Sequence, residues 1–290
     1  MPEVADLDNK IKKIWPKNGP STQQIDKYIK KYLKEKIVIK CGGRVLLDPD
    51  LFNNFISDVS ILKKLGLTPI IVHGGGPRIK KKLDELNINT KFIMGLRVTD
   101  ENVIKVVENV MIEFNKEIVD ALEKKGCKAK SITAKENNVI YVEKKNEILG
   151  FVGIPTKVDD NLIKNFIKDD FIPVVSPMGI DDKKQTYNIN ADTAAGALAI
   201  SLKSRRLLLM TDVAGVYNKD KKLISEIKPT EAEGLIYDAT VSEGMIPKIR
   251  TCIKAIDDGV KGVVIIDGRK PHSILYELFS DSGSGTLIRK

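Results

Sequence analysis

The fold is decided between Ile37 and Pro77, where the sequence reads IVIKCGGRVLLDPDLFNNFISDVSILKKLGLTPIIVHGGGP. This stretch contains two short apolar runs, Ile37–Lys40 and Pro69–His73, and a cluster of glycines follows each of them directly. Pro49 and Pro77 then suit the first turn of a helix, and the residues after Pro49 are apolar at helical spacing. A strand, a glycine turn and a helix in repeated succession predict an α/β fold around a mostly parallel sheet.

The same pattern continues through the rest of the chain. Three further apolar runs are Phe171–Val175, Arg206–Met210 and Gly262–Asp267, and such continuous runs are typical of strands that helices cover on both faces. Between residues 99 and 122 the apolar positions recur with a period of about 3.6, so we expect a long helix that Thr99 caps. Residues 137–153 instead predict a β-hairpin.

Composition excludes several classes of protein. The 290 residues are 42% hydrophobic and 30% charged, as in ordinary folded enzymes, and no run of about 18 apolar residues is present to span a membrane. The acidic, polar N-terminus has no apolar signal core. Cys41, Cys127 and Cys252 are odd in number and far apart, which fits neither a disulfide framework nor metal-ligand spacing. We therefore expect a cytoplasmic enzyme with reduced thiols.

The net charge of +9 does not indicate a nucleic-acid-binding protein, because basic and acidic residues are interleaved along the whole chain. A lysine-rich solvated surface is the simpler interpretation, and its field also attracts anionic ATP. His73 and His272 lack partners at metal-ligand spacing, so we expect both to be structural, and no metal site on the protein itself.

The two glycine clusters suit an anionic ligand. Without side chains, the backbone N–H groups of such turns can approach an anion closely, and the start of the following helix adds a favourable dipole. Lys40 stands immediately before one cluster, and ligands of open α/β sheets bind at these carboxyl ends of the strands. Neither a P-loop nor a dinucleotide-binding glycine motif is present. The pattern indicates a polyphosphate.

Eight short blocks carry a resemblance to a known family. In chain order they are IVIKCGG, VHGGGP, GLRVTD (Gly95–Asp100), NINADTAAGALA (Asn188–Ala199), TDVAGV (Thr211–Val216), EGMIPKI (Glu243–Ile249), IIDGRKPH (Ile265–His272) and GSGTLI (Gly283–Ile288). Together, and in this order, they resemble the N-acetylglutamate kinase branch of the amino-acid kinase family, from about Lys36 to the C-terminus. The GLRVT block separates this branch from the aspartate, glutamate-5 and uridylate kinases.

The resemblance implies a three-layer sandwich with a helical extension at 1–36, an acetylglutamate-binding lobe at 37–205 and an ATP-binding lobe at 206–290. It also implies that ATP, with Mg²⁺ held mainly through the nucleotide, phosphorylates the γ-carboxylate of N-acetyl-L-glutamate, the second step of arginine biosynthesis. Such a transfer needs no covalent nucleophile from the protein. It needs two anions held in line and stabilisation of the charge on the migrating group.

The same resemblance implies a role for each residue that matches a family position. Lys40 and Lys248 would stabilise the transition state, and Asp192 would orient both lysines, since a carboxylate between two ammonium groups keeps its charge. Arg97 would bind the α-carboxylate of the substrate in a bidentate manner. The other implied substrate-binding residues are Gly75, Gly76 and Asn188, and the implied ATP-binding residues are Gly43, Asn190, Asp212, Val213, Gly215, Tyr217, Gly244 and Met245.

Alternative interpretations remain open from the sequence. Taken singly, Lys40 could be the solvated end of a strand, Lys248 a charge on a lysine-rich helix and Asp192 a helix cap. Two related activities are a kinase of carrier-linked 2-aminoadipate and the kinase-like domain of acetylglutamate synthase, which an acetyltransferase domain would follow. A non-catalytic arginine-sensing protein would need neither lysine, and both are retained.

The N-terminal extension resembles that of arginine-inhibited family members. We expect Ser21 to cap a helix, and the apolar face of this helix carries Ile25, Ile29, Tyr32 and Leu33. The resemblance places Tyr28, His272 and Gly283 at a regulatory site for L-arginine. It implies a homo-oligomer, a dimer at least and a hexamer where the helix interlaces with that of a neighbouring dimer. The alternative is a helix folded back on its own subunit.

Overall fold

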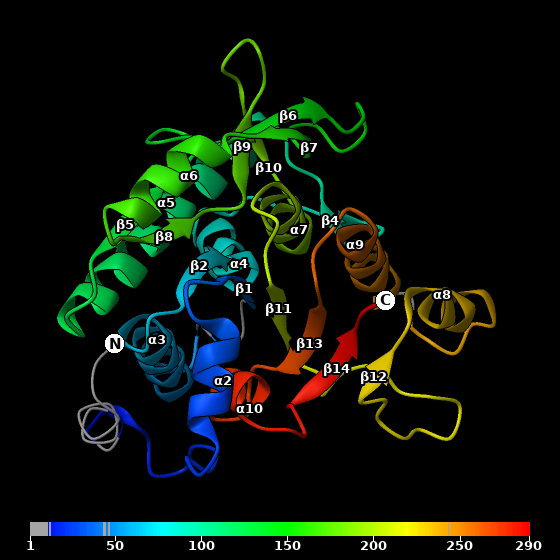
Figure 1. Ribbon diagram of the computed structural model, residues 1–290. Coiled ribbons are helices and arrows are strands. Elements are labelled where there is room, and N and C mark those ends of the chain that lie inside the picture. The colour runs from blue at the N-terminus through cyan, green and yellow to red at the C-terminus, as the bar shows by residue number, and fades with distance from the viewer. Residues whose placement is uncertain (1–10, 12, 43–44, 46, 243) are drawn as a thin grey trace.

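The structure, a computed structural model, describes residues 11, 13–42, 45, 47–242 and 244–290. Its centre is an eight-stranded sheet in the order β12-β14-β13-β11-β1-β2-β8-β5 (Figure 1). The strands are β1 (Lys36–Cys41), β2 (Thr68–His73), β5 (Ala129–Ile132), β8 (Ile172–Val175), β11 (Arg206–Thr211), β12 (Glu226–Ile227), β13 (Val263–Asp267) and β14 (Gly285–Ile288). Neighbouring strands are parallel except for the antiparallel pair β13 and β14.

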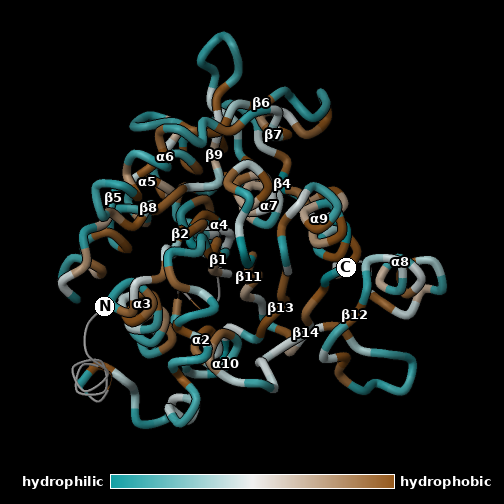
Figure 2. Tube along the Cα trace, in the orientation of Figure 1, coloured by the Kyte–Doolittle hydropathy of each residue, from teal (hydrophilic) through white to brown (hydrophobic). Residues whose placement is uncertain are grey.

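Helices cover both faces of this sheet. One layer contains α2 (Ile25–Tyr32), α3 (Pro49–Lys64), α5 (Glu101–Lys124) and α10 (Ser273–Phe279), and the other contains α6 (Asp160–Lys168), α7 (Ala191–Ser201), α8 (Pro229–Tyr237) and α9 (Ile246–Asp257). Strand β1 shows how the sequence builds the layers, because Ile37 and Ile39 pack into the first layer and Val38 into the second. The central strands, whose hydropathy Figure 2 shows along the chain, therefore pack apolar side chains into both layers. The predicted α/β sandwich is confirmed.

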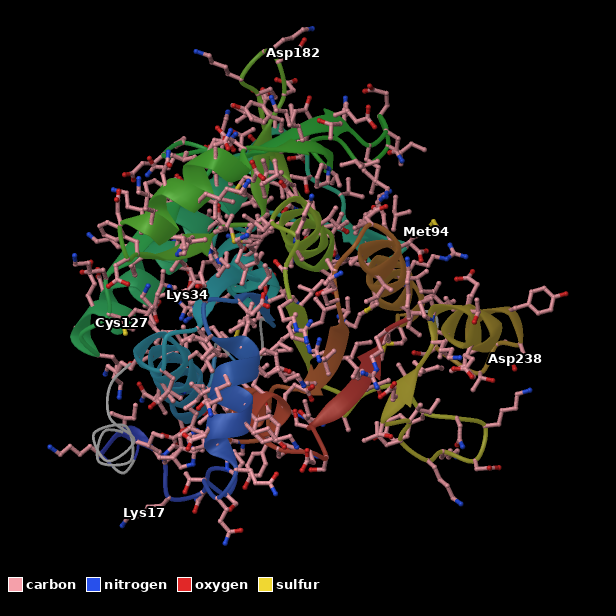
Figure 3. All side chains as sticks on the ribbon, in the orientation of Figure 1. Lys17, Lys34, Met94, Cys127, Asp182 and Asp238 are labelled. Atoms are coloured by element: carbon pink, nitrogen blue, oxygen red, sulfur yellow. The ribbon has the colours of Figure 1, made fainter. Side chains whose placement is uncertain are left out.

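Two smaller sheets stand beside the central one. Strands β6 (Ile140–Lys144), β7 (Gly153–Val158), β9 (Met178–Ile180) and β10 (Thr186–Asn188) form the sheet β10-β9-β6-β7, and β3 (Phe92–Ile93) pairs with β4 (Leu96–Arg97). The first strand of the hairpin predicted at 137–153 is confirmed as β6, but the second strand expected within that range is wrong, because β7 begins only at Gly153. Met94, at the turn of the β3–β4 hairpin, is 91% exposed and lies at the edge of the molecule in Figure 3.

Two expected helix caps, Thr99 and Ser21, are wrong. Asp100, rather than Thr99, caps α5, because its side chain accepts from the N–H groups of Asn102 and Val103. The expected cap of the N-terminal helix at Ser21 is also wrong, since α2 begins after Gln24. Pro49 opens α3 as predicted, and α4 (Gly76–Glu85) begins one residue before Pro77.

The N-terminal extension packs on its own chain. Ile25, Tyr28, Ile29 and Tyr32 are buried, whereas Leu33 remains 44% exposed. Helix α2 contacts α10, and the indole ring of Trp15 packs edge-on against Phe279. The alternative of a helix folded back on its own subunit therefore accounts for most of this apolar face. Residues 1–10 and residue 12, which belong to the helical extension expected at 1–36, lie outside the described residues.

No helix in the described part of the chain is both long enough and apolar enough to cross a membrane.

Candidate active site

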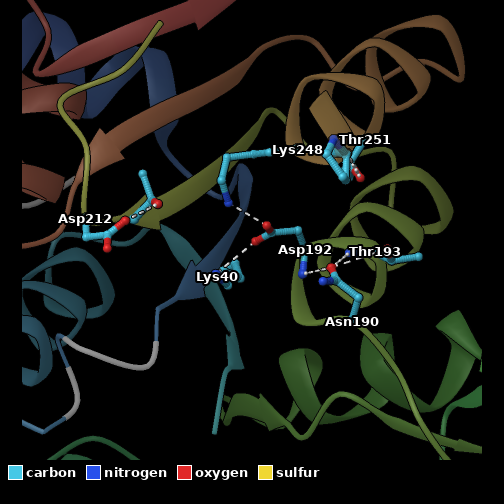
Figure 4. A network of polar contacts seen from close by, with 9 residues as sticks. Lys40, Asn190, Asp192, Thr193, Asp212, Lys248 and Thr251 are labelled. Atoms are coloured by element: carbon cyan, nitrogen blue, oxygen red, sulfur yellow. Dashed lines mark hydrogen bonds and ion pairs between the residues drawn. The ribbon is translucent and has the colours of Figure 1, made fainter. Parts of the chain in front are cut away.

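Three charged side chains from three separate elements meet at the carboxyl edge of the central sheet (Figure 4). The Nζ of Lys40 lies 2.9 Å from Oδ1 of Asp192, and the Nζ of Lys248 lies 2.5 Å from Oδ2 of the same carboxylate. The side chains are only 11–14% exposed. Residues that are 208 positions apart in the sequence thus share one counter-ion.

Local structure explains how each of these groups is placed. Lys40 is the penultimate residue of β1, at the point where the strand turns into the first glycine cluster. Asp192 lies in the first turn of α7, where the helix dipole favours a negative charge. Asn190 caps that helix by accepting from the N–H groups of Asp192 and Thr193. Lys248 lies in the first turn of α9, after Pro247.

The electrostatics of this cluster keep the carboxylate ionised. Burial by itself would raise the pKa of Asp192, but the ammonium groups of Lys40 and Lys248 outweigh it and hold the pKa well below its usual range. The carboxyl group is therefore charged at any pH at which an enzyme works. Because it stays ionised, Asp192 can position the two ammonium groups, but it is too weak a base to accept a proton.

A cavity of about 240 Å³ opens next to this cluster. Six residues implied by the resemblance line it, namely Lys40, Gly75, Gly76, Arg97, Asn188 and Asn190. Gly75 and Gly76 begin α4, and the first N–H groups of a helix have no intrahelical partner. A Cβ atom at Gly75 would lie 2.7 Å from Cε of Met111, so a side chain there would require Met111 to shift. The cavity thus combines a cation, free N–H donors and small residues.

Arg97 presents a buried cation to this cavity. The residue is 7% exposed, and its guanidinium lies over the Phe92 ring, with its Cζ 4.7 Å from the ring centroid. Its Nη2 donates to the carbonyl oxygen of Gly76 at 3.2 Å. No ion pair to Arg97 is found among the described residues, and burial lowers its pKa. A carboxylate of a ligand would supply the missing counter-charge.

Several lining residues were not singled out from the sequence. These are Phe92, Gly95 and Leu96 of the β3–β4 hairpin, together with Gly74, Met111, Val152 and Pro177. The GLRVTD block contains Gly95 and Leu96, so the family resemblance already pointed to this hairpin. Met111 gave no such signal, because on the sequence it is one more apolar residue of a long helix. Only the packing of α5 against the second glycine cluster brings it to the cavity.

Apart from Asn190, the residues implied in nucleotide binding that the structure describes do not line this cavity. Asp212, Val213, Gly215 and Tyr217 follow β11, and Gly244 and Met245 lie just before α9. Gly215 has a φ of 151°, and the N–H of Val216 donates to the hydroxyl of Thr286 on β14, so this turn is held firmly against the sheet. Gly43 lies outside the described residues. The set is thus grouped around the end of β11 and the start of α9, next to Lys248.

The three residues expected at a regulatory site are separated into two places. Tyr28 of α2 lies beside Asp281, which also pairs with Lys27 at 2.9 Å, and Gly283 follows Asp281 by two positions. His272 instead bonds through Nδ1 to the buried carboxylate of Asp58 on α3, at 2.6 Å. Glu277 was not singled out from the sequence, and its Oε2 accepts a hydrogen bond from the N–H of Ser284 at 2.9 Å.

Comparison with known proteins identifies relatives of this chain. Residues 35–267 match the model of the amino acid kinase family. An acetylglutamate kinase of Pelagibacter ubique (strain HTCC1062) is 57% identical over 277 residues, which cover 96% of this chain and 96% of that relative.

Solved structures share the fold. An N-acetylglutamate synthase from Neisseria gonorrhoeae, complexed with coenzyme A and N-acetyl-glutamate, superposes with a TM-score of 0.84 at 23% identity, covering 92% of this chain and 62% of that chain. The same synthase complexed with coenzyme A and L-arginine gives 0.80 at 22% identity, with 93% and 64% covered. The chain thus spans less than two thirds of the synthase, and at these identities the likeness shows the fold alone.

Proposed function

Because the chain belongs to the amino acid kinase family, in its acetylglutamate kinase branch, we propose how its site phosphorylates N-acetyl-L-glutamate. The enzyme transfers the γ-phosphoryl group of ATP to the γ-carboxylate, giving ADP and N-acetyl-L-glutamyl 5-phosphate for arginine biosynthesis. The observation that carries the proposal is the carboxylate of Asp192 held between Lys40 and Lys248, beside a cavity that presents Arg97. Both substrates are anions, and the site is cationic on both sides.

The proposed mechanism is positioning and charge stabilisation. The γ-carboxylate is already ionised at neutral pH, so it attacks without a general base, and Asp192 takes no proton. Arg97 holds the α-carboxylate, and Asn188 binds the acetylamino group. Lys40 and Lys248 approach the phosphoryl group from opposite sides, and the N–H groups of Gly75 and Gly76 donate to its oxygens. These charges act most strongly in the transition state, when the transferred group lies between two anionic oxygens.

We assign the acetylglutamate site to the lobe at 37–205 and the ATP site to the lobe at 206–290. The turn at 212–217 follows β11, and the segment at 244–245 directly precedes α9, which carries Lys248. The phosphates of ATP must lie beside Lys248 for transfer. Mg²⁺ would be held through phosphate oxygens and would neutralise their charge, since no cluster of three or more His, Cys, Asp or Glu side chains suits a metal in the described part of the chain.

Cys41, Cys127 and Cys252 are free and buried, which supports a reducing, cytoplasmic location.

We further propose that L-arginine binds between α2 and α10. Burial raises the pKa of Glu277 there, and the side chains of Lys31 and Arg206 lie close enough to lower it in part. A half-buried carboxylate among cations suits a ligand that carries both an ammonium or guanidinium group and a carboxylate. Tyr28 and Gly283 border the place, whereas His272 faces Asp58 and would act there only through α10.

The substrate assignment is tested by an ADP-release assay with N-acetyl-L-glutamate, L-glutamate, L-aspartate and L-2-aminoadipate side by side. We expect turnover of N-acetyl-L-glutamate and little of free glutamate, because an ammonium group would replace the acetylamino group. Equal or faster turnover of glutamate or aspartate would contradict the assignment. A preference for 2-aminoadipate linked to a carrier would favour the related lysine-pathway reaction.

A further inference from the structure

The mechanism leaves one buried imidazole without a role. His73 is the last residue of β2 and directly precedes the second glycine cluster, and it is fully buried. Its ring packs edge-on against Phe114, with 5.2 Å between ring centroids. Nδ1 lies 3.3 Å from the carbonyl oxygen of Gly74, and Nε2 lies 3.1 Å from Nδ2 of Asn115 on α5. Both ring nitrogens thus face a polar partner.

Asn115 fixes which nitrogen carries the proton. The same Nδ2 atom lies 2.9 Å from the carbonyl oxygen of Val174 on β8, and a carbonyl oxygen accepts hydrogen bonds only. The atom that faces it must therefore be the amide nitrogen, which has hydrogens to donate and no acceptor site. Nε2 of His73 must then accept from this group, and in a neutral imidazole the single N–H lies on Nδ1. Burial lowers the pKa of His73 to about 4, so the ring is neutral at neutral pH.

The Nδ1–H group points at the peptide that joins Gly74 to Gly75. In a trans peptide the C=O and the N–H lie in one plane and point in opposite directions. A hydrogen bond that holds the carbonyl of Gly74 toward His73 therefore holds the N–H of Gly75 away from it. Gly75 lines the cavity beside Lys40, and His73 does not. The N–H of Gly74 is already used, since it donates to the carbonyl of Cys41 at 2.9 Å.

We propose that His73 and Asn115 are positioning residues, which fix the Gly74–Gly75 peptide so that its N–H faces the phosphoryl group. Helix α5 is the platform for this arrangement, because Asn115 anchors the ring from one turn while Met111, one turn earlier, packs against Gly75 itself. The inference rests on the proposed function, since it supposes a phosphoryl group beside Gly75. Neither residue touches a substrate, so both act through the backbone.

Two variants of His73 separate its two contacts. The side-chain amide of Asn can occupy the position of Nδ1. His73→Asn therefore keeps an N–H that donates to the carbonyl of Gly74 and loses the atom that accepts from Asn115. The amide of Gln reaches the place of Nε2, so His73→Gln keeps the acceptor and loses the donor. We expect His73→Gln to lower kcat about 10- to 100-fold, with KM for both substrates within about threefold, because a donor to the transferred group is misdirected. His73→Asn should stay within about fivefold of wild-type kcat.

A matched control is Ser60→Ala, which removes a buried hydroxyl that contacts Sγ of Cys127 at 3.4 Å, away from the site. Its kcat should stay within about twofold of wild type. The thermal midpoint of every variant is measured beside its kinetics. Equal losses of kcat in His73→Asn and His73→Gln, in step with their loss of thermal stability, would show a merely structural role and overturn the proposal.

Nitrogen-15 NMR of the untagged protein reads the tautomer directly. The chain has just two histidines, so the His73→Asn spectrum identifies the signals of His73 by subtraction. We expect a protonated Nδ1 and an unprotonated Nε2 at pH 7, and the reverse pattern would overturn the inference. A wild-type enzyme that does not phosphorylate acetylglutamate would refute the proposed function instead, and the NMR result would still decide the tautomer.

Discussion

At the scale of the residue, Lys248 and Arg97 should affect different kinetic constants. The interaction of Lys248 with the migrating group grows as charge develops on it, so Lys248→Ala should lower kcat about 100- to 1000-fold and change the KM for acetylglutamate little. Steady-state kinetics with both substrates varied measures this split. A large rise in KM with unchanged kcat would place Lys248 in ground-state binding.

Arg97 should show the opposite behaviour. It holds the α-carboxylate equally in the ground state and in the transition state, so Arg97→Ala should raise the KM for acetylglutamate about 10- to 100-fold and leave kcat nearly unchanged. The KM for ATP serves as the internal control, because the guanidinium lines the cavity that we assign to acetylglutamate. Control of kcat alone by Arg97 would mean that the roles of the two cations are exchanged.

His73 also gives the stability a pH dependence whose sign follows from its pKa. Its folded pKa of about 4 is below the ordinary value of 6.5, so the unfolded chain binds a proton that the folded chain refuses. The contribution of neutral His73 to the free energy of unfolding is therefore present above pH 6.5 and is lost as the pH falls toward 4. Between pH 6.5 and pH 5 the loss is about 2 kcal/mol. Urea unfolding at pH 7 and pH 5 should show this extra loss in wild type and not in His73→Asn; identical pH dependence in both would contradict it.

At the scale of the element, the effect of the cap of α5, Asp100, can be compared with that of Ser21, which the sequence suggested as a cap of α2 and the structure does not use. Asp100→Ala should lower the free energy of unfolding by about 1 kcal/mol, because it removes the acceptor for two N–H groups of the first turn. Ser21→Ala is the matched control, since Ser21 is exposed and lies before Gln24, the residue that precedes α2. Urea denaturation of both variants should show a change of less than about 0.5 kcal/mol for Ser21→Ala. Equal losses would mean that Ser21 caps α2 after all.

The reason for the corrected cap lies in contacts between elements. The carbonyl of Thr99 accepts from the N–H of Phe151, and the N–H of Thr99 donates to the carbonyl of Leu149. These bonds hold Thr99 extended against the loop before β7, and its hydroxyl donates to the carbonyl of Arg97. The next residue, Asp100, is the first whose side chain is free to turn back onto the helix.

At the scale of the whole molecule, α2 decides the proposed regulation and assembly. We expect L-arginine at millimolar concentration to inhibit the full-length enzyme, and removal of residues 1–30 to abolish the inhibition. Glu277→Gln is the point variant that should keep the activity and lose the inhibition, because it removes the half-buried charge without removing a helix. Light scattering of the full-length and truncated proteins tests the hexamer that the family resemblance suggests. A full-length dimer that arginine does not inhibit would refute this regulation and leave the kinase reaction intact.

The sequence by itself determined the layered fold and much of the candidate site. The alternation of apolar runs, glycine turns and helical stretches is a local property, so β1, α3 and β2 could be predicted from the residues they contain. The carboxyl ends of parallel strands meet at one edge of a sheet, which already placed the two glycine clusters together. The remaining site residues came from eight blocks that resemble one family.

Only the tertiary structure decided which side chains that are distant in the sequence contact each other. The pairing of Asp192 with Lys40 and Lys248 could be inferred from the family, but the burial of these ion pairs is set by the packed lobes. The contacts of His73 with Asn115, of Glu277 with Ser284 and of Met111 with Gly75 left no mark on the sequence. The physical reason is that periodicity reports which face of an element is buried, whereas a hydrogen bond depends on two atoms whose separation is set by the packing of every element between them.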